Sequence, residues 1–128
     1  MEKDVKRALV VDSDKLNLYL VSEYLMRLGY NPEILTDKNN VLKHAKEQRP
    51  NIILWEVNYK NDCDQKVLSE LKIACNSSRI ILITAHSEFE IYGLCQKSGI
   101  QEYINKPMIF NQFKTVVNSR QKGYIKNS

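Results

Sequence analysis

The sequence predicts an α/β fold built on a doubly wound, parallel sheet of five strands. Short apolar runs rich in β-branched residues alternate with helix-like segments at nearly regular spacing along the chain. Several of these runs are continuously apolar, which is typical of parallel strands covered by helices on both faces. With 128 residues, 43% of them hydrophobic, the chain is large enough to bury a core as one domain.

The first unit is a buried strand at residues 7 to 12, followed by a helix from about Asp14 to Leu28. Apolar residues at helical spacing predict the face of this helix that packs on the sheet. The members of this stripe are Leu16, Leu20, Tyr24 and Leu28. Gly29 is well placed to end the helix.

The second unit is less apolar, and we therefore expect it at the edge of the sheet. Its strand spans residues 32 to 36, and Asp37 can cap a helix that runs to about Gln48. The residues expected to face inward from this helix are Val41, Leu42 and Ala45.

The third unit begins after Pro50 with a strand at residues 51 to 57. A polar loop with the sequence NYKNDCD leads from this strand into a helix. The apolar positions of that helix are Val67, Leu68, Leu71 and Ala74.

The last two units complete the pattern. A fourth strand covers residues 79 to 84, and Ser87 and Glu90 have the spacing of a capping box for a helix that Gly99 would end. The fifth strand is expected at residues 100 to 105. The apolar positions of the fifth helix are Ile109, Phe113, Val116 and Val117.

Right-handed crossovers leave few topologies for five such units, among them the flavodoxin-like strand order 2-1-3-4-5. Polar residues close four of the apolar runs, namely Asp12, Glu56, Thr84 and Lys106. Because parallel strands end at one edge of the sheet, these side chains should meet in a shallow acidic pocket there. We expect one domain over residues 1 to 122, with residues 123 to 128 as a tail or the start of a linker.

Composition favours a protein of the reducing cytosol. The three cysteines are widely spaced and form no metal-binding pattern, and no apolar stretch approaches the length of a membrane span. We therefore expect a cytoplasmic location and no contact with membranes. The net charge of +4 arises at the end of the chain, since five basic residues and no acidic residue follow Glu102. This excess is either a solvated face or a docking surface for an acidic partner.

Four segments resemble the receiver domains of two-component response regulators: VVDSDKLN, NIILWEVN, ILITA and YINKP. Each segment alone is weak evidence, but all four occur in the right order and the resemblance covers essentially the whole chain. It implies a flavodoxin-like (βα)5 domain. In that family an acidic pair and an aspartate hold Mg²⁺, and the aspartate accepts a phosphoryl group from a histidine kinase.

The acidic positions of this family are only partly matched. Asp12 fits the first acidic position, Ser13 occupies the second, and Glu56 stands where the phosphoacceptor aspartate is expected. The resemblance places the backbone carbonyl of Asn58 in the metal site. The loop that follows also departs from the family, because Cys63-Asp64 replaces the usual Asp-Gly. The resemblance is therefore to an atypical receiver.

The positions that would grip a phosphoryl group agree better with the family. Thr84 supplies the hydroxyl, followed by the small Ala85, and Lys106-Pro107 supplies the lysine before a proline. A cis Lys106-Pro107 bond would aim the ammonium group into the pocket. Tyr103 occupies the position of an aromatic residue whose ring, in that family, turns inward when the hydroxyl group at the position of Thr84 moves.

The substitutions predict that phosphorylation chemistry is lost. Forming an acyl phosphate needs a carboxylate in line with the phosphorus, and a displacement of about 1 Å can cost roughly a hundredfold in rate. Glu56 is one methylene longer than aspartate, and Ser13 removes a carboxylate that Mg²⁺ would use. We expect no catalytic residue, no cofactor, and Mg²⁺ binding at Asp12 that is weak or absent.

Three interpretations of Glu56 remain open. Its carboxylate pairs with Lys106 and only neutralises charge, or it partly mimics a phosphoryl group and draws Thr84 and Lys106 inward, or phosphorylation persists on Glu56 or a neighbouring acid. Neighbouring positions also have plain structural interpretations. Ser13 can cap the first helix, Thr84 and Tyr103 can be core residues, and both histidines, His44 and His86, fit surface positions.

Two functional classes therefore remain. One is a signalling module that is not an enzyme and that binds a protein partner through its fourth helix, fifth strand and fifth helix; an acidic partner surface is one alternative. The other is a functional phosphoacceptor receiver, served by a histidine kinase or a phosphotransfer protein with Mg²⁺. Contact with nucleic acid is expected only through an output domain beyond this sequence. A flavodoxin-type cofactor binder is disfavoured because no Ser/Thr-rich phosphate loop follows the first strand.

Overall fold

The computed structural model describes residues 5–57, 63–85 and 88–119. These residues form five strands and five α-helices in strict alternation, with one short 3-10 helix. The strands are β1 (Lys6–Val11), β2 (Tyr30–Leu35), β3 (Ile52–Glu56), β4 (Arg79–Thr84) and β5 (Glu102–Asn105). The helices are α1 (Lys15–Arg27), η1 (Lys38–Asn40), α2 (Val41–Gln48), α3 (Cys63–Ala74), α4 (Glu88–Ser98) and α5 (Phe110–Asn118).

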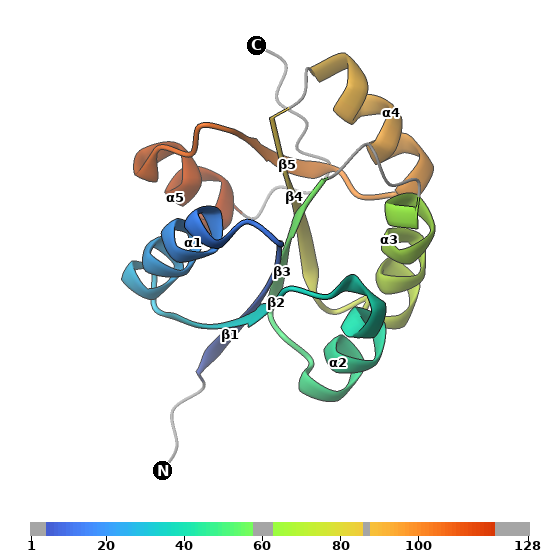
Figure 1. Cartoon of the computed structure of the whole chain (residues 1–128), viewed down its shortest axis with the longest axis horizontal. Coiled ribbons are helices and arrows are strands. Elements are labelled where there is room, and N and C mark those ends of the chain that lie inside the picture. Colours follow the sequence, from blue (N-terminus) through green and yellow to red (C-terminus); the bar gives the residue numbers. More distant parts are fainter. Residues whose placement is uncertain (1–4, 58–62, 86–87, 120–128) are drawn as a thin grey trace.

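The strands form one parallel sheet in the order β2-β1-β3-β4-β5, which confirms the predicted flavodoxin-like topology. Helices α1 and α5 lie on one face of the sheet, and α2, α3 and α4 lie on the other (Figure 1). The edge position of β2 is confirmed as well. Its Pro32 has no backbone N–H to donate to a neighbouring strand, and an edge strand tolerates this because one of its sides is unpaired.

Alternating side chains of the strands build two separate cores. Leu9 and Trp55 belong to the core beneath α2, α3 and α4, whereas Val10 and Leu54 belong to the core beneath α1 and α5. Successive residues of a strand point to opposite faces, so a strand buried on both sides must be apolar at every position. This is why the central parts of β1, β3 and β4, at residues 8–11, 52–55 and 80–83, are apolar without a break.

The buried face of α1 differs from the predicted stripe. Leu16 is 82% exposed, and the side chains that pack on the sheet are those of Leu18, Val21 and Leu25. Leu20, Tyr24 and Leu28 are partly buried at the border of this core. The sequence carries two neighbouring apolar stripes on this helix, and the prediction chose the outer one.

Smaller differences occur at the ends of elements. Ile109 precedes α5 and is 55% exposed, while Met108 is buried in its place. Ala74 is likewise exposed, and the next residue, Cys75, is buried instead. Gly29 and Gly99 end α1 and α4 with positive φ angles, as predicted, a backbone conformation that favours glycine.

The strand and helix starts also shift by a few residues. β2 begins at Tyr30, two residues before the predicted start, and β5 begins at Glu102. Asp37 caps η1 through its side chain, and α2 begins only at Val41. The capping role predicted for Ser87 lies outside the described residues.

The packing of α1 makes a direct test possible. Leu25→Ala should lower the free energy of unfolding by about 3 kcal/mol, because it leaves a cavity beneath α1. Leu16→Ala is the matched control on the same helix and should change stability by less than about 0.5 kcal/mol. Urea denaturation of both variants measures these values. The reverse ranking would contradict the described face of α1.

Candidate functional site

Asp12 follows β1 and lies buried at the carboxyl edge of the sheet, with 1% of its surface exposed. Its carboxylate accepts hydrogen bonds from the backbone N–H of Asp14, at 2.9 Å, and from the side-chain amide of Asn17. The N-cap of α1 is Asp14, whose carboxylate accepts from the N–H groups of Leu16 and Asn17. The capping role considered for Ser13 is therefore wrong, and its side chain is exposed.

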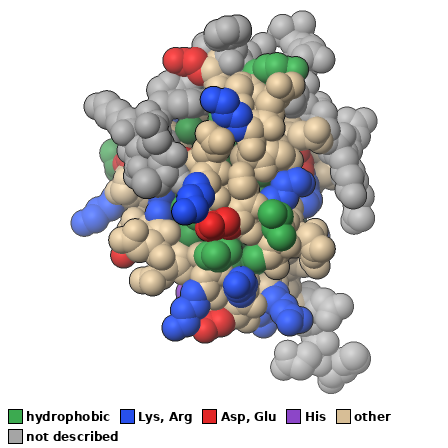
Figure 2. All heavy atoms as spheres, turned by 90° about the vertical axis from the view of Figure 1, so that its right-hand side faces the viewer, with side chains coloured by type: hydrophobic (Ala, Val, Ile, Leu, Met, Phe, Trp, Pro, Cys, Tyr) green, Lys and Arg blue, Asp and Glu red, His purple; other side chains and the backbone are tan. Residues whose placement is uncertain are grey.

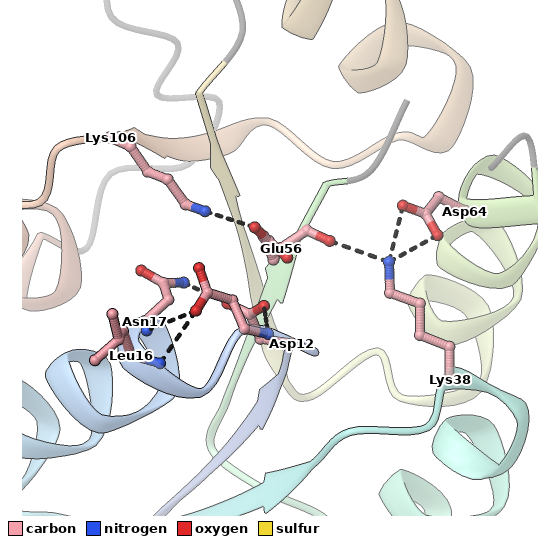
Figure 3. A network of polar contacts seen from close by, with 8 residues as sticks. Asp12, Leu16, Asn17, Lys38, Glu56, Asp64 and Lys106 are labelled. Carbon is pink, nitrogen blue, oxygen red and sulfur yellow. Dashed lines mark hydrogen bonds and ion pairs between the residues drawn. The ribbon is translucent and has the colours of Figure 1, made fainter. Parts of the chain in front are cut away.

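Glu56 ends β3 and forms an ion pair with Lys106 across the pocket. The Lys106 Nζ atom lies 2.5 Å from Glu56 Oε2, and both side chains are mostly buried. Figure 3 shows the two side chains pointing toward each other, with Asp12 below Glu56. The backbone N–H of Lys106 donates to the Thr84 carbonyl at 2.8 Å, and the Lys106-Pro107 peptide bond is cis. Three adjacent strand ends thus meet at this point.

The environment raises the pKa of the Glu56 carboxyl group above its ordinary value of 4.5. Burial is the largest cause, since it penalises the charged form, and a hydrogen bond with the Asp12 carboxyl group acts in the same direction. The ammonium group of Lys106 opposes both effects. The site therefore holds two carboxyl groups in contact and one lysine that compensates them in part.

The remaining predicted residues divide between core and surface. Thr84 is fully buried, and Tyr103, at 3% exposed, belongs to the core beneath α2, α3 and α4. Ala85 and Pro107 are exposed beside the pocket. Of the other predicted positions, Asn58 and His86 lie outside the described residues. His44 is partly exposed and pairs with Glu33, with Nε2 and Oε2 at 3.1 Å.

Lys38 and Asp64 also belong to this edge of the sheet, and sequence reasoning did not identify either of them as a site residue. The Lys38 ammonium group donates to both Asp64 oxygens, at 3.0 and 3.1 Å, and to the Glu56 backbone carbonyl at 3.1 Å. It also lies 4.7 Å from the centre of the Trp55 ring. Only the change of Asp-Gly to Cys63-Asp64 hinted at this pair, and nothing pointed to Lys38.

These contacts bear on which cation the edge could hold. Divalent cations such as Mg²⁺ are bound by carboxylates and other oxygen ligands. Among the described residues, Asp12 and Glu56 are the acids next to Lys106. Glu56 is already paired with the Lys106 ammonium group, and Ser13 carries no charge. Within the described part of the chain, no three His, Cys, Asp or Glu residues group together as metal ligands.

The fold and its polar edge define a class, the flavodoxin-like α/β domains that carry their functional site at the carboxyl ends of the strands. Within that class, the family model of the response regulator receiver domain matches residues 8–118 of this sequence. The chain belongs to this family, whose members are signalling modules of two-component systems.

Curated relatives agree with this assignment at low identity. The transcriptional regulatory protein ZraR of Escherichia coli K12 is 25% identical over 109 residues, covering 85% of this chain and 25% of the relative. The alkaline phosphatase synthesis transcriptional regulatory protein PhoP of Bacillus subtilis is 27% identical over 123 residues, covering 96% of this chain and 50% of the relative. The chain therefore spans between a quarter and a half of these two proteins.

Solved structures show the same fold. A CheY-like receiver domain from Methanospirillum hungatei superposes with a TM-score of 0.78 at 21% identity, covering 89% of this chain and 91% of that one. A response regulator protein from Burkholderia pseudomallei, solved with a phosphorylated aspartic acid, calcium ion and citrate, superposes with a TM-score of 0.76 at 21% identity. The match covers 89% of this chain and 67% of that one. None of the helices described in this chain has the length and apolar character needed to span a membrane.

The raised pKa of Glu56 predicts a particular dependence of stability on pH. A carboxyl group whose pKa rises on folding contributes stability that is present below pH 4.5 and is lost as the pH rises through the folded value. The free energy of unfolding, taken relative to the non-titrating variant Glu56→Gln, should therefore fall as the pH rises from 4.5 toward neutrality. Urea denaturation across this range tests the sign. A relative stability that grows with pH would show that attraction to Lys106 outweighs burial.

Proposed function

We propose that this chain is an atypical receiver domain that signals through protein contacts and does not run a phosphorylation cycle. The observation that carries this proposal is the ion pair between Glu56, at the phosphoacceptor position, and Lys106. Lysine at this position grips the phosphoryl oxygens in the family that the chain resembles. In this chain the same ammonium group is already bound to the residue that would have to be phosphorylated.

The geometry of Glu56 also argues against its use as a nucleophile. The side chain is longer than aspartate by one methylene, and its Oε2 atom accepts a hydrogen bond from the Lys106 ammonium group at 2.5 Å. Transfer of a phosphoryl group needs a free carboxylate oxygen in line with the phosphorus. The Glu56 carboxyl group is also held beside a second acid, Asp12, which adds repulsion against an incoming phosphate.

Binding of Mg²⁺ should be weak or absent for the same reasons. This hard cation usually relies on one or two carboxylates together with phosphate oxygens, and it keeps several waters. Asp12 could supply one ligand, but Ser13 lacks the second carboxylate and Glu56 is engaged by Lys106. If the cation bound, it would neutralise phosphoryl oxygens. We propose that the module works without a metal or other cofactor.

The contacts of Glu56 further support the proposal that the switch residues of the receiver domain are held in one state. Its carboxylate extends toward Lys106, Thr84 is fully buried, and the Tyr103 ring lies inward in the core. This arrangement fits a carboxylate that partly replaces a phosphoryl group. The replacement is incomplete, because a carboxylate carries one negative charge and a phosphoryl group about 1.5 to 2, with three acceptor oxygens.

A protein partner is the expected target, and histidine kinases or phosphotransfer proteins are the class that the family suggests. We propose that α4, β5 and α5 form the docking face. In the described part of this face Lys97, Lys114 and the acid Glu90 are exposed, whereas Glu102 of β5 is paired with Arg79 of the neighbouring β4. Figure 2 shows that basic side chains also spread over the side of the molecule where α3 and α4 lie. An acidic partner would be complementary to both regions.

Phosphorylation assays test the proposal directly. After incubation with Mg²⁺ and acetyl phosphate, intact-mass spectrometry should show no phosphoryl adduct on the wild-type chain, because the Glu56 side chain is longer than aspartate and its carboxylate is bound to Lys106. Beryllofluoride should leave the amide NMR signals of Glu56 and Thr84 unchanged. A stable phosphoryl adduct mapped to Glu56 would contradict the proposal and favour a functional phosphoacceptor receiver.

The double variant Ser13→Asp with Glu56→Asp is the matched control. It restores both acids at their expected positions, so it should bind Mg²⁺ and accept the phosphoryl group if these two residues alone block the chemistry. The fluorescence of Trp55, the single tryptophan in the chain, follows binding next to Glu56. If binding stays absent, the altered loop between Glu56 and Asp64 also contributes.

A further inference from the structure

Lys38 is a mostly buried cation with a complete set of partners. Its side chain is 25% exposed and that of Asp64 is 5% exposed. Besides the two Asp64 oxygens, the ammonium group meets the Glu56 carbonyl, and the Trp55 ring supports it through a cation-π contact. A buried ion pair is stable only when its remaining donors are satisfied, and here three acceptors meet the three donors of the ammonium group.

The contacts of Lys38 join three elements that are distant in the sequence. Lys38 begins η1 after β2, Glu56 ends β3, and Asp64 lies in the first turn of α3. The ammonium group thus bridges the two ends of the connection between β3 and α3. This connection leads away from the residue at the phosphoacceptor position.

Glu56 is consequently held from both sides of the sheet. Trp55 packs in the core beneath α2, α3 and α4, so the next side chain, that of Glu56, points to the opposite face and reaches Lys106. Lys38 approaches from the Trp55 side and binds the backbone carbonyl of Glu56. Figure 3 shows the two lysines on opposite sides of Glu56, with Asp64 beyond Lys38.

We propose that Lys38 is a positioning residue for Glu56. Through Asp64 and the Glu56 carbonyl it fixes the direction in which the main chain leaves β3, and so it keeps the Glu56 carboxylate at Lys106. A neutral side chain at position 38 would leave Asp64 charged and buried without this counter-ion, and it would free the Glu56 carbonyl. This inference goes beyond the proposed function, since it holds whether or not Glu56 can be phosphorylated.

Amide hydrogen exchange provides the test. The Val57 N–H donates to the Ile83 carbonyl at 2.8 Å directly after Glu56, so its exchange rate reports opening of this strand end. In the full chain, Lys38→Met should speed exchange of Val57 by about tenfold or more, the loss expected for a hydrogen bond to a charged group. Amides in the centre of β1, such as that of Val10, should change much less. The carboxyl carbon signal of Glu56 should also shift, because the carboxylate is no longer held at Lys106.

Two further variants complete the design. Lys38→Arg keeps the positive charge and should retain most of the protection of the Val57 amide from exchange. Asp64→Asn removes the counter-ion of Lys38 and should give the same result as Lys38→Met. It replaces Lys38→Met in the experiment if that variant does not fold. A uniform increase of exchange at Val57 and Val10 would show a general loss of stability and would overturn the positioning role. Unchanged exchange at Val57 together with an unchanged Glu56 signal would overturn it as well.

Discussion

The ion pair between Glu56 and Lys106 is the interaction on which the arrangement of this site depends. A parallel sheet brings all strand ends to one edge, and the order of the strands places Asp12, Glu56 and Lys106 within reach of one another. Two acids buried side by side would repel each other, and one lysine compensates them only in part. A carboxylate committed to this ammonium group has little freedom to serve as a nucleophile.

The same edge carries a second cation, the ammonium group of Lys38. Lys38 binds Asp64 and the backbone of Glu56, while Lys106 binds the side chain of Glu56. Three buried or partly buried carboxyl groups, those of Asp12, Glu56 and Asp64, therefore face two ammonium groups from the protein itself. The negative charge of these carboxyl groups is therefore balanced in large part by the lysines of the protein itself.

Much of this arrangement could be predicted from the sequence, because strands buried on both faces leave unbroken apolar runs and their polar end residues stand out. This reasoning found Asp12, Glu56 and Lys106. It misjudged α1, where periodicity alone could not decide between the stripe that starts at Leu16 and the one that contains Leu18. It missed Lys38, because a long side chain that crosses from η1 to α3 leaves no periodic pattern.

A double-mutant cycle on Glu56 and Lys106 measures the strength of this ion pair in solution. The single variants Glu56→Gln and Lys106→Met and the double variant remove the two charges separately and together, and urea denaturation at neutral pH gives the free energy of unfolding of each. If the two side chains form the described ion pair, the cycle should give a favourable coupling energy of about 1 to 3 kcal/mol. A coupling energy near zero would mean that Glu56 is not held by Lys106 in solution, and it would rule out the ion pair as the basis of this site.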